Sequence, residues 1–169
     1  LDNNAFSATI PDGLCSLTNL EILDLHSAGL LGSIPANIGN LVNLQIFEGH
    51  HNKLSGKIPE SICNMKELRK LALNANALDG RIPDAIGNLK NLESLFLCNN
   101  MLYGSVPSSI GECVNLLYVN VGDNKIDGEI PTSIGNCVKL VEFSAYSNKL
   151  GGTLPEELGN CSQLEILSV

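Results

Sequence analysis

The repeating pattern of this chain is clearest in the stretch LRKLALNANALDGRIP, at residues 68–83. Its last residue, Pro83, belongs to a set of seven prolines in which each lies 24 residues from the next. Spacing this strict marks an internal repeat, which takes precedence over any local secondary-structure pattern. Alignment on the prolines gives the unit LxxLxLxxNxLxGxIPxxIGNLxxL. The prolines are Pro11, Pro35, Pro59, Pro83, Pro107, Pro131 and Pro155.

The alternating leucines of each unit, such as Leu71 and Leu73, predict a short strand with one buried face. One unit cannot bury that face alone, so the units must stack, with neighbouring strands about 4.8 Å apart. We therefore expect an α/β solenoid with 24-residue repeats and a parallel β-sheet on its concave side. We expect one domain over residues 1–169, with six full repeats starting near 20, 44, 68, 92, 116 and 140, and partial repeats at 1–19 and 164–169.

An asparagine recurs where each strand should end and the chain turns inward. A buried amide at this corner can satisfy backbone groups of its own and the neighbouring turn, which would form a ladder along the stack. Ala28 interrupts the series, and we expect a water molecule or a shifted backbone beside it. The series comprises Asn4, Asn52, Asn76, Asn100, Asn124 and Asn148.

The LxGxIPxxIGxLxxL half of the unit resembles the plant-type leucine-rich repeat, and this resemblance covers essentially the whole chain. It implies a right-handed leucine-rich-repeat superhelix that serves as an extracellular or cell-surface binding scaffold. The nearest type is a fragment of a receptor-like kinase ectodomain, whose partners would be an extracellular peptide or protein ligand and a co-receptor. The alternative is a secreted inhibitor of a cell-wall glycosidase, similar to polygalacturonase-inhibiting proteins. Since the sequence starts and stops within strands, we expect it to be part of a longer ectodomain.

The amino-acid composition and net charge limit the classes of partner that the chain is expected to bind. The chain has 18 acidic and 10 basic residues and a formal net charge of −8. A nucleic-acid phosphate backbone demands a basic stripe, so nucleic acid is not an expected partner. No apolar run approaches the length of a membrane span. We expect no cofactor and no enzymatic activity.

Six cysteines in a secreted-type chain would ordinarily indicate disulfide bridges. Cys113, Cys137 and Cys161 instead occupy a buried position of the repeat that elsewhere holds Leu or Met, so we interpret them as small buried hydrophobes. Asn160 begins the sequon Asn-Cys-Ser, which makes it a candidate glycosylation site.

The residues that flank the buried strand positions should point onto the open concave surface. Equivalent positions of adjacent repeats would then form rows about 5 Å apart. The candidate ligand-binding residues on this face are Asp24, His26, Glu48, His50, Lys70, Asn74, Phe96, Cys98, Tyr118, Asn120, Glu142 and Tyr146.

All three histidines of the chain, His26, His50 and His51, should gather at one place on this face, with Asp24 and Glu48 one step along the same strands. Imidazoles beside carboxylates can bind Zn²⁺ or Ni²⁺, or can act as a pH-sensitive contact. The simpler alternative is a solvated polar patch that touches a partner, and we favour this alternative over a metal site.

Three of the seven aromatic residues, Phe96, Tyr118 and Tyr146, should lie further along the concave face, where core packing does not require them. Small neighbours such as Ala72 and Ser144 would make a shallow groove beside these rings, which are suited to act as binding anchors. Cys98 and His50 should stand two strands apart, about 10 Å, which exceeds the reach of a nucleophile and base pair.

Overall fold

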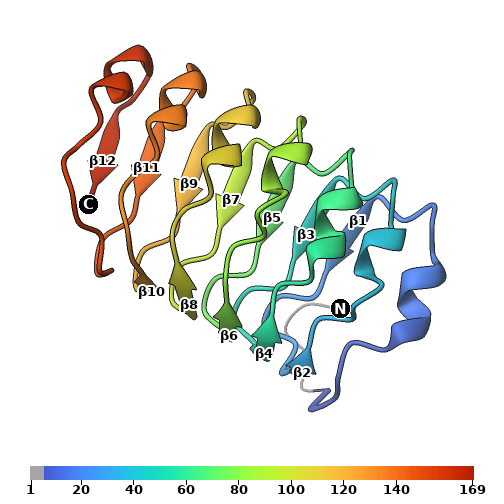
Figure 1. The fold of residues 1–169 in the computed structure, drawn as a ribbon. Helices are drawn as coiled ribbons and strands as arrows, with labels where there is room; N and C mark the ends of the chain where they lie inside the picture. The colour runs from blue at the N-terminus through green and yellow to red at the C-terminus, as the bar shows by residue number, and fades with distance from the viewer. Residues whose placement is uncertain (1–5) are drawn as a thin grey trace.

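A computed structural model describes residues 6–169 and shows a curved stack of repeats (Figure 1). Parallel strands line one side of the stack in the order β1-β3-β5-β7-β9-β11-β12. Their register pairs residues 24 positions apart, as in Ile22 with Ile46. The predicted parallel sheet is therefore confirmed. Its strands are β1 (Ile22–Asp24), β3 (Ile46–Glu48), β5 (Lys70–Ala72), β7 (Ser94–Phe96), β9 (Tyr118–Asn120), β11 (Glu142–Ser144) and β12 (Ile166–Ser168).

A second parallel sheet, in the order β10-β8-β6-β4-β2, follows the turn after each concave strand. This second sheet was not predicted from the sequence. The apolar Leu54 between the polar residues Lys53 and Ser55 could have indicated strand β4 from the sequence. In the structure Leu54 is buried and both neighbours are exposed. The strands of this sheet are β2 (Leu31–Ser33), β4 (Lys53–Lys57), β6 (Ala77–Gly80), β8 (Met101–Gly104) and β10 (Lys125–Ile126).

The helical segments on the side opposite the concave sheet are all short 3₁₀ turns, and most of them begin directly after the repeat proline. Proline fixes φ and lacks an N–H, so it suits a position where the chain enters a helical turn. In Figure 1 these turns line the outer side of the stack. They are η1 (Asp12–Ser16), η2 (Ile38–Asn40), η3 (Glu60–Asn64), η4 (Ile86–Asn88), η5 (Ser108–Glu112), η6 (Thr132–Asn136) and η7 (Glu156–Asn160).

The core between these layers is almost entirely aliphatic, and Phe47 and Phe143 are its only fully buried aromatic side chains among the described residues. Each lies in the middle of a concave strand, at the position that other repeats fill with Leu or Val. The glycine three residues before each repeat proline from Pro35 onward adopts a backbone conformation that other residues disfavour. Gly80, for example, has a φ of 87°, a left-handed conformation that glycine adopts without strain.

The asparagine ladder is confirmed for the described repeats. The Nδ2 of Asn76 donates to the carbonyl oxygens of Gly49 at 2.9 Å and Leu73 at 3.0 Å, and its Oδ1 accepts from the N–H of Leu54. Equivalent bonds recur at Asn100, Asn124 and Asn148. Asn4 lies outside the described residues. The ladder thus joins each turn to its neighbours through groups that would otherwise be buried and unpaired.

At Ala28, where the asparagine ladder is interrupted, the backbone is shifted. In the regular repeats the N–H of the ladder residue donates to a backbone carbonyl of the next repeat, whereas the N–H of Ala28 donates to Oδ1 of Asn52 at 3.1 Å. Gly29, the next residue, has a φ of 70°, and no later repeat has a positive φ at that position. Asn52 therefore also satisfies the turn that has no asparagine of its own.

Candidate functional site

The concave strands place their outward side chains in rows, because every strand pairs with the next in the same register. One row runs through Asp24, Glu48, Ala72 and Phe96, which are successive partners across β1, β3, β5 and β7. Along this row, charged side chains on β1 and β3 give way to Ala72 on β5 and to the aromatic Phe96 on β7.

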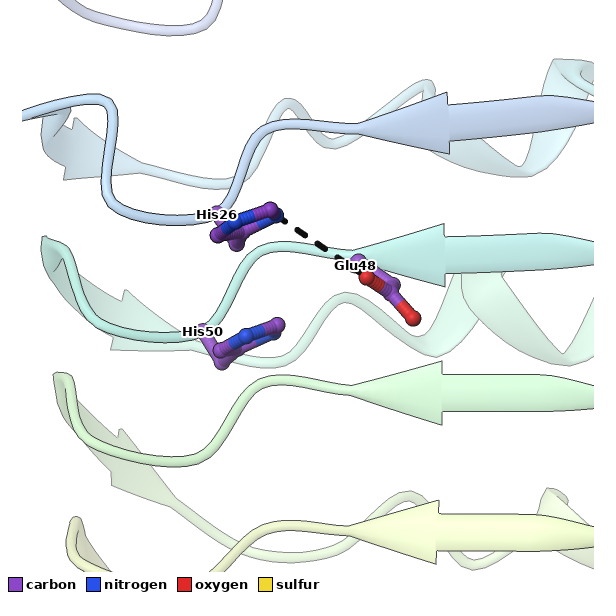
Figure 2. A group of neighbouring side chains, drawn as sticks. All are labelled: His26, Glu48 and His50. Carbon is purple, nitrogen blue, oxygen red and sulfur yellow. Dashed lines mark ion pairs between the residues drawn. The ribbon is translucent and has the colours of Figure 1, made fainter. Parts of the chain in front are cut away.

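The charged end contains a group of five residues, Asp24, His26, Glu48, His50 and Lys70, which we call the histidine cluster. Nδ1 of His26 lies 2.7 Å from Oδ1 of Asp24 and 4.0 Å from Oε2 of Glu48. The second oxygen of Glu48, Oε1, forms an ion pair with Nζ of Lys70. The rings of His26 and His50 stack with their centroids 4.9 Å apart and their planes within 4°. Figure 2 shows the two stacked rings with the Glu48 carboxylate beside them.

The pKa values of Asp24 and His50 are both lowered, but for different reasons. Burial would raise the pKa of Asp24, but hydrogen bonds from the side chain and the backbone N–H of His26 outweigh that effect and lower it. For His50, burial lowers the pKa below its ordinary value of 6.5, and the positive charges of His26, His51 and Lys70 lower it further against the opposing effect of Glu48. His50 is therefore a neutral imidazole at pH 7.

The third histidine stands at the edge of the cluster. His51 has a φ of 54°, in the left-handed region, and its ring meets the ring of His50 at 70° with the centroids 5.4 Å apart. The side chain is exposed, in contrast to the half-buried His26 and His50. The structure therefore groups Glu48, and not His51, with the other two histidines as potential metal ligands.

The aromatic end is built around Tyr146 and Gly122. A Cβ atom on Gly122 would lie only 2.5 Å from Cε1 of Tyr146, so the tyrosine ring lies directly on the glycine. Desolvation raises the pKa of Tyr146, and the nearby acidic groups Asp123 and Glu142 raise it further. Tyr118, 37% exposed, and the half-buried Phe96 complete the aromatic surface.

Between the two ends lies a hollow of about 320 Å³ over β3, β5 and β7. It joins the positive charge of Lys70, the ring of Phe96 and the thiol of Cys98 around polar imidazole and amide groups. We call it the central hollow, and its lining residues are His50, His51, Lys70, Ala72, Asn74, Phe96 and Cys98.

Five of the twelve predicted ligand-binding residues therefore share one hollow. Tyr118, Asn120, Glu142 and Tyr146 lie further along the face, on or after β9 and β11. Two of these are engaged within their own strands, because the N–H of Gly122 donates to Asn120 and the hydroxyl of Ser144 donates to Glu142. The residues in the hollow are His50, Lys70, Asn74, Phe96 and Cys98.

The small residues beside the aromatic rings are more buried than expected. Ala72 lines the central hollow next to Phe96, but Ala72 and Ser144 are only 2% and 3% exposed. Their side chains are short, and longer side chains on adjacent strands cover them at cross-strand spacing. Ala72, for instance, has Glu48 and Phe96 as its two partners. These small residues therefore form the floor of the surface.

The cysteines match the interpretation as small hydrophobes. All six lie in the described part of the chain and are free. The thiols of Cys113 and Cys137 donate to the carbonyl oxygens of Ile86 and Ile110, and burial raises the pKa of each to about 12. Burial also raises the pKa of Cys98, which lowers the fraction of thiolate at neutral pH.

A polar hollow on the flank of the sheet was missed by the sequence reasoning. There Nη2 of Arg69 lies 2.5 Å from Oε1 of Glu93, and Asn91 donates to the carbonyl of Lys66. The residues sit just before the concave strands, so their 24-residue spacing was a signal that could have found them. The hollow is lined by Gln45, Glu67, Arg69, Asn91, Glu93 and Asn115.

Comparison with known families agrees with this architecture. The family described as Leucine Rich Repeat matches residues 19–41, 91–113, 115–137 and 139–161, more than half of the chain. The protein is a member of the leucine-rich-repeat family. No curated protein sequence matches this leucine-rich-repeat chain.

Solved structures of plant receptors are similar to this leucine-rich-repeat protein. The ectodomain of the Arabidopsis thaliana membrane receptor kinase GASSHO1/SCHENGEN3, in complex with CASPARIAN STRIP INTEGRITY FACTOR 2, is 32% identical with a TM-score of 0.80 over 95% of this chain. The plant peptide hormone receptor RGFR1, in complex with RGF2, is 34% identical with a TM-score of 0.77 over 99%. The Arabidopsis receptor kinase HAESA, in complex with the peptide hormone IDA and the co-receptor SERK1, is 31% identical with a TM-score of 0.72 over 99%.

The chain spans 22%, 31% and 32% of the length of these three receptor chains. Within residues 6–169, no helix has the length and hydropathy needed to cross a lipid bilayer.

Proposed function

We propose that this leucine-rich-repeat chain is a non-catalytic binding scaffold that holds an extended peptide or a partner protein on its concave face. It would act as part of an extracellular sensing domain, with a co-receptor as a second partner. The observation that carries the proposal is the central hollow, where an aromatic ring, a lysine and polar groups surround a small floor residue on a rigid sheet.

The chemistry of the hollow suits a peptide. Phe96 offers an apolar surface, Lys70 offers a positive charge, and Asn74 offers an amide that can both donate and accept hydrogen bonds. Backbone hydrogen bonds to both neighbours hold each strand rigid, so the surface loses little conformational entropy when it binds a flexible ligand. The similar receptors GASSHO1/SCHENGEN3 and RGFR1 were each solved with a bound partner, which supports the same class of activity here.

The test is a binding screen of the chain against secreted peptides and secreted glycosidases. For any partner found, Phe96→Ala and Tyr118→Ala should each weaken binding by about tenfold or more, as expected for aromatic anchors. Tyr103→Ala is the matched control, because Tyr103 is 46% exposed on β8 of the second sheet. Equal loss in all three variants, or no loss at Phe96 and Tyr118, would remove the concave face as the binding site.

Glycosylation of Asn160 would indicate that the chain passes through the secretory pathway. This residue ends η7 and is exposed, as the following Ser162 is, while Cys161 between them is buried. We expect N-glycosylation there when the chain is made in a secretory host. A glycosidase should lower the intact mass of the secreted chain, and Asn160→Gln should abolish that change. An unaltered mass after treatment would show that the sequon is unused.

A further inference from the structure

Sequence alone favours a solvated patch at the three histidines, but the structure arranges the histidine cluster in a more specific way. We propose that His26, Glu48 and His50 form a binding site for a divalent transition-metal ion of the zinc class. The site goes beyond the proposed peptide-binding function and does not depend on it.

The first supporting observation is the convergence of three ligand-type side chains from two adjacent repeats. His26, Glu48 and His50 can each offer one ligand atom so that all three atoms lie within 4.8 Å of one another. Figure 2 shows the carboxylate of Glu48 beside the stacked rings of the two histidines. Ligand atoms around a tetrahedral zinc ion are about 3.3 Å apart. The side chains must therefore move closer together, and the two parallel rings must tilt so that their nitrogens point at one ion. All three side chains are only half-buried, which leaves room for this movement.

The second observation is an unsatisfied nitrogen. Nδ1 of His50 is buried and has no hydrogen-bond partner among the described residues. Buried polar atoms are paired in nearly all proteins, so an exception demands an explanation, and an ion is one of the usual ones.

The third observation concerns the surrounding groups, which resemble the outer shell of a metal site. Glu48 presents Oε2 toward His26 while Lys70 holds its other oxygen, Oε1, so the carboxylate is oriented but not fully occupied. Asp24 lies 2.7 Å from Nδ1 of His26, which is the carboxylate–histidine contact that orients ligating imidazoles in many metal proteins. The carboxylates of Asp24 and Glu48 outnumber the single ammonium group of Lys70 in the cluster, which favours a cation.

The donor set defines the class of metal. Two imidazoles and one carboxylate suit Zn²⁺, Ni²⁺ or Cu²⁺, whereas Mg²⁺ and Ca²⁺ prefer oxygen ligands alone. Three protein ligands leave at least one coordination position for water or for a donor atom of a bound ligand. Because His26 and His50 come from successive repeats, the ion would also join the ends of β1 and β3.

The test is calorimetric titration of the full chain with zinc chloride at pH 7.5 in a buffer that does not chelate metals. We expect one zinc ion per chain and at least a tenfold loss of affinity in His26→Gln, Glu48→Gln and His50→Gln. His51→Asn is the matched control, because His51 is adjacent but outside the group, and asparagine tolerates its left-handed backbone. Its affinity should stay within twofold of the parent chain, and a tenfold excess of Mg²⁺ should not compete.

The main alternative is zinc binding at the thiol of Cys98, which lines the central hollow together with His50. Cys98→Ser should leave zinc affinity within twofold, and X-ray absorption of the zinc-loaded chain should show nitrogen and oxygen ligands without sulfur. Absence of zinc binding up to millimolar concentration, unchanged affinity in the three site variants, or a sulfur ligand would each overturn the proposal. Circular dichroism of every variant separates loss of the site from loss of the fold.

Discussion

The side-chain oxygen of Asn76 accepts a hydrogen bond of 2.9 Å from the backbone N–H of Leu54, which belongs to the preceding repeat. The amide nitrogen of Asn76 meanwhile donates to the carbonyl oxygens of Gly49 and Leu73. One side chain thus pairs backbone groups of two repeats that the stack removes from water.

Replacement of this amide should be costly. In Asn76→Ala the N–H of Leu54 loses its partner, and an unpaired buried group costs about 1–3 kcal/mol. The carbonyls of Gly49 and Leu73 keep bonds from the neighbouring asparagines Asn52 and Asn100. We expect the free energy of unfolding to fall by about 2 kcal/mol or more, measured by chemical denaturation. Asn91→Ala is the control, since Asn91 is exposed and donates a single hydrogen bond to Lys66, and it should cost less than about 1 kcal/mol. Similar losses in both variants would refute the role of the ladder.

The contact between Tyr146 and Gly122 predicts a spectroscopic change. In Gly122→Ala the added Cβ would lie 2.5 Å from the tyrosine ring, so the ring must move away from the surface. Because desolvation is the main cause that raises the pKa of Tyr146, this pKa should fall toward its ordinary value of 10. Ultraviolet titration of a chain with Tyr103→Phe and Tyr118→Phe isolates the signal of Tyr146. An unchanged titration curve in Gly122→Ala would contradict the close packing of the ring.

The lowered pKa of His50 predicts a dependence of stability on pH. Above pH 6.5 His50 is neutral in both the folded and the unfolded chain. As pH falls below 6.5 the unfolded chain takes up the proton first, so the folded state loses stability until the pH passes the lower folded pKa. Denaturant unfolding between pH 7.5 and pH 5 should therefore show a larger loss in the parent chain than in His50→Gln. Asp24, whose pKa is below 3.8, does not titrate in this window. Parallel curves for the two chains would show that His50 has no such effect.

The free cysteines predict a simple chemical result. Ellman's reagent should modify one thiol of the native chain, Cys98, because the other five are buried. Burial raises the pKa of Cys63 to about 11 and that of Cys113 and Cys137 to about 12, which further suppresses their thiolates. Six thiols should react after unfolding without a reductant. Fewer than six would reveal a disulfide bridge.

The sequence predicted much of this fold because a 24-residue repeat constrains every copy in the same way. Proline spacing located the strands, and the alternation of residues such as Leu71 and Leu73 identified their buried face. The asparagine series predicted the ladder. The missing asparagine at Ala28 predicted either a water molecule or a shifted backbone, and the structure shows the shifted backbone at Gly29.

The parts that could not be predicted depend on contacts between repeats. The residue before each ladder asparagine has a left-handed φ, and at two of these positions the residue is Ala75 or Ser147, which do not favour that conformation. Tertiary packing imposes it there. The burial of Ala72 likewise depends on the length of its neighbours on adjacent strands, which a pattern of apolar and polar residues does not report.

On a chain of 18.0 kDa, nuclear magnetic resonance can locate a partner on the concave face residue by residue. A partner recovered from the binding screen would be titrated into the isotope-labelled protein while backbone amide shifts are followed. Binding on the concave face should shift the amides of β3, β5, β7 and β9 most, around His50, Lys70 and Phe96, and leave the 3₁₀ turns η3–η6 unaffected. Shifts confined to those turns or to the second sheet would contradict it.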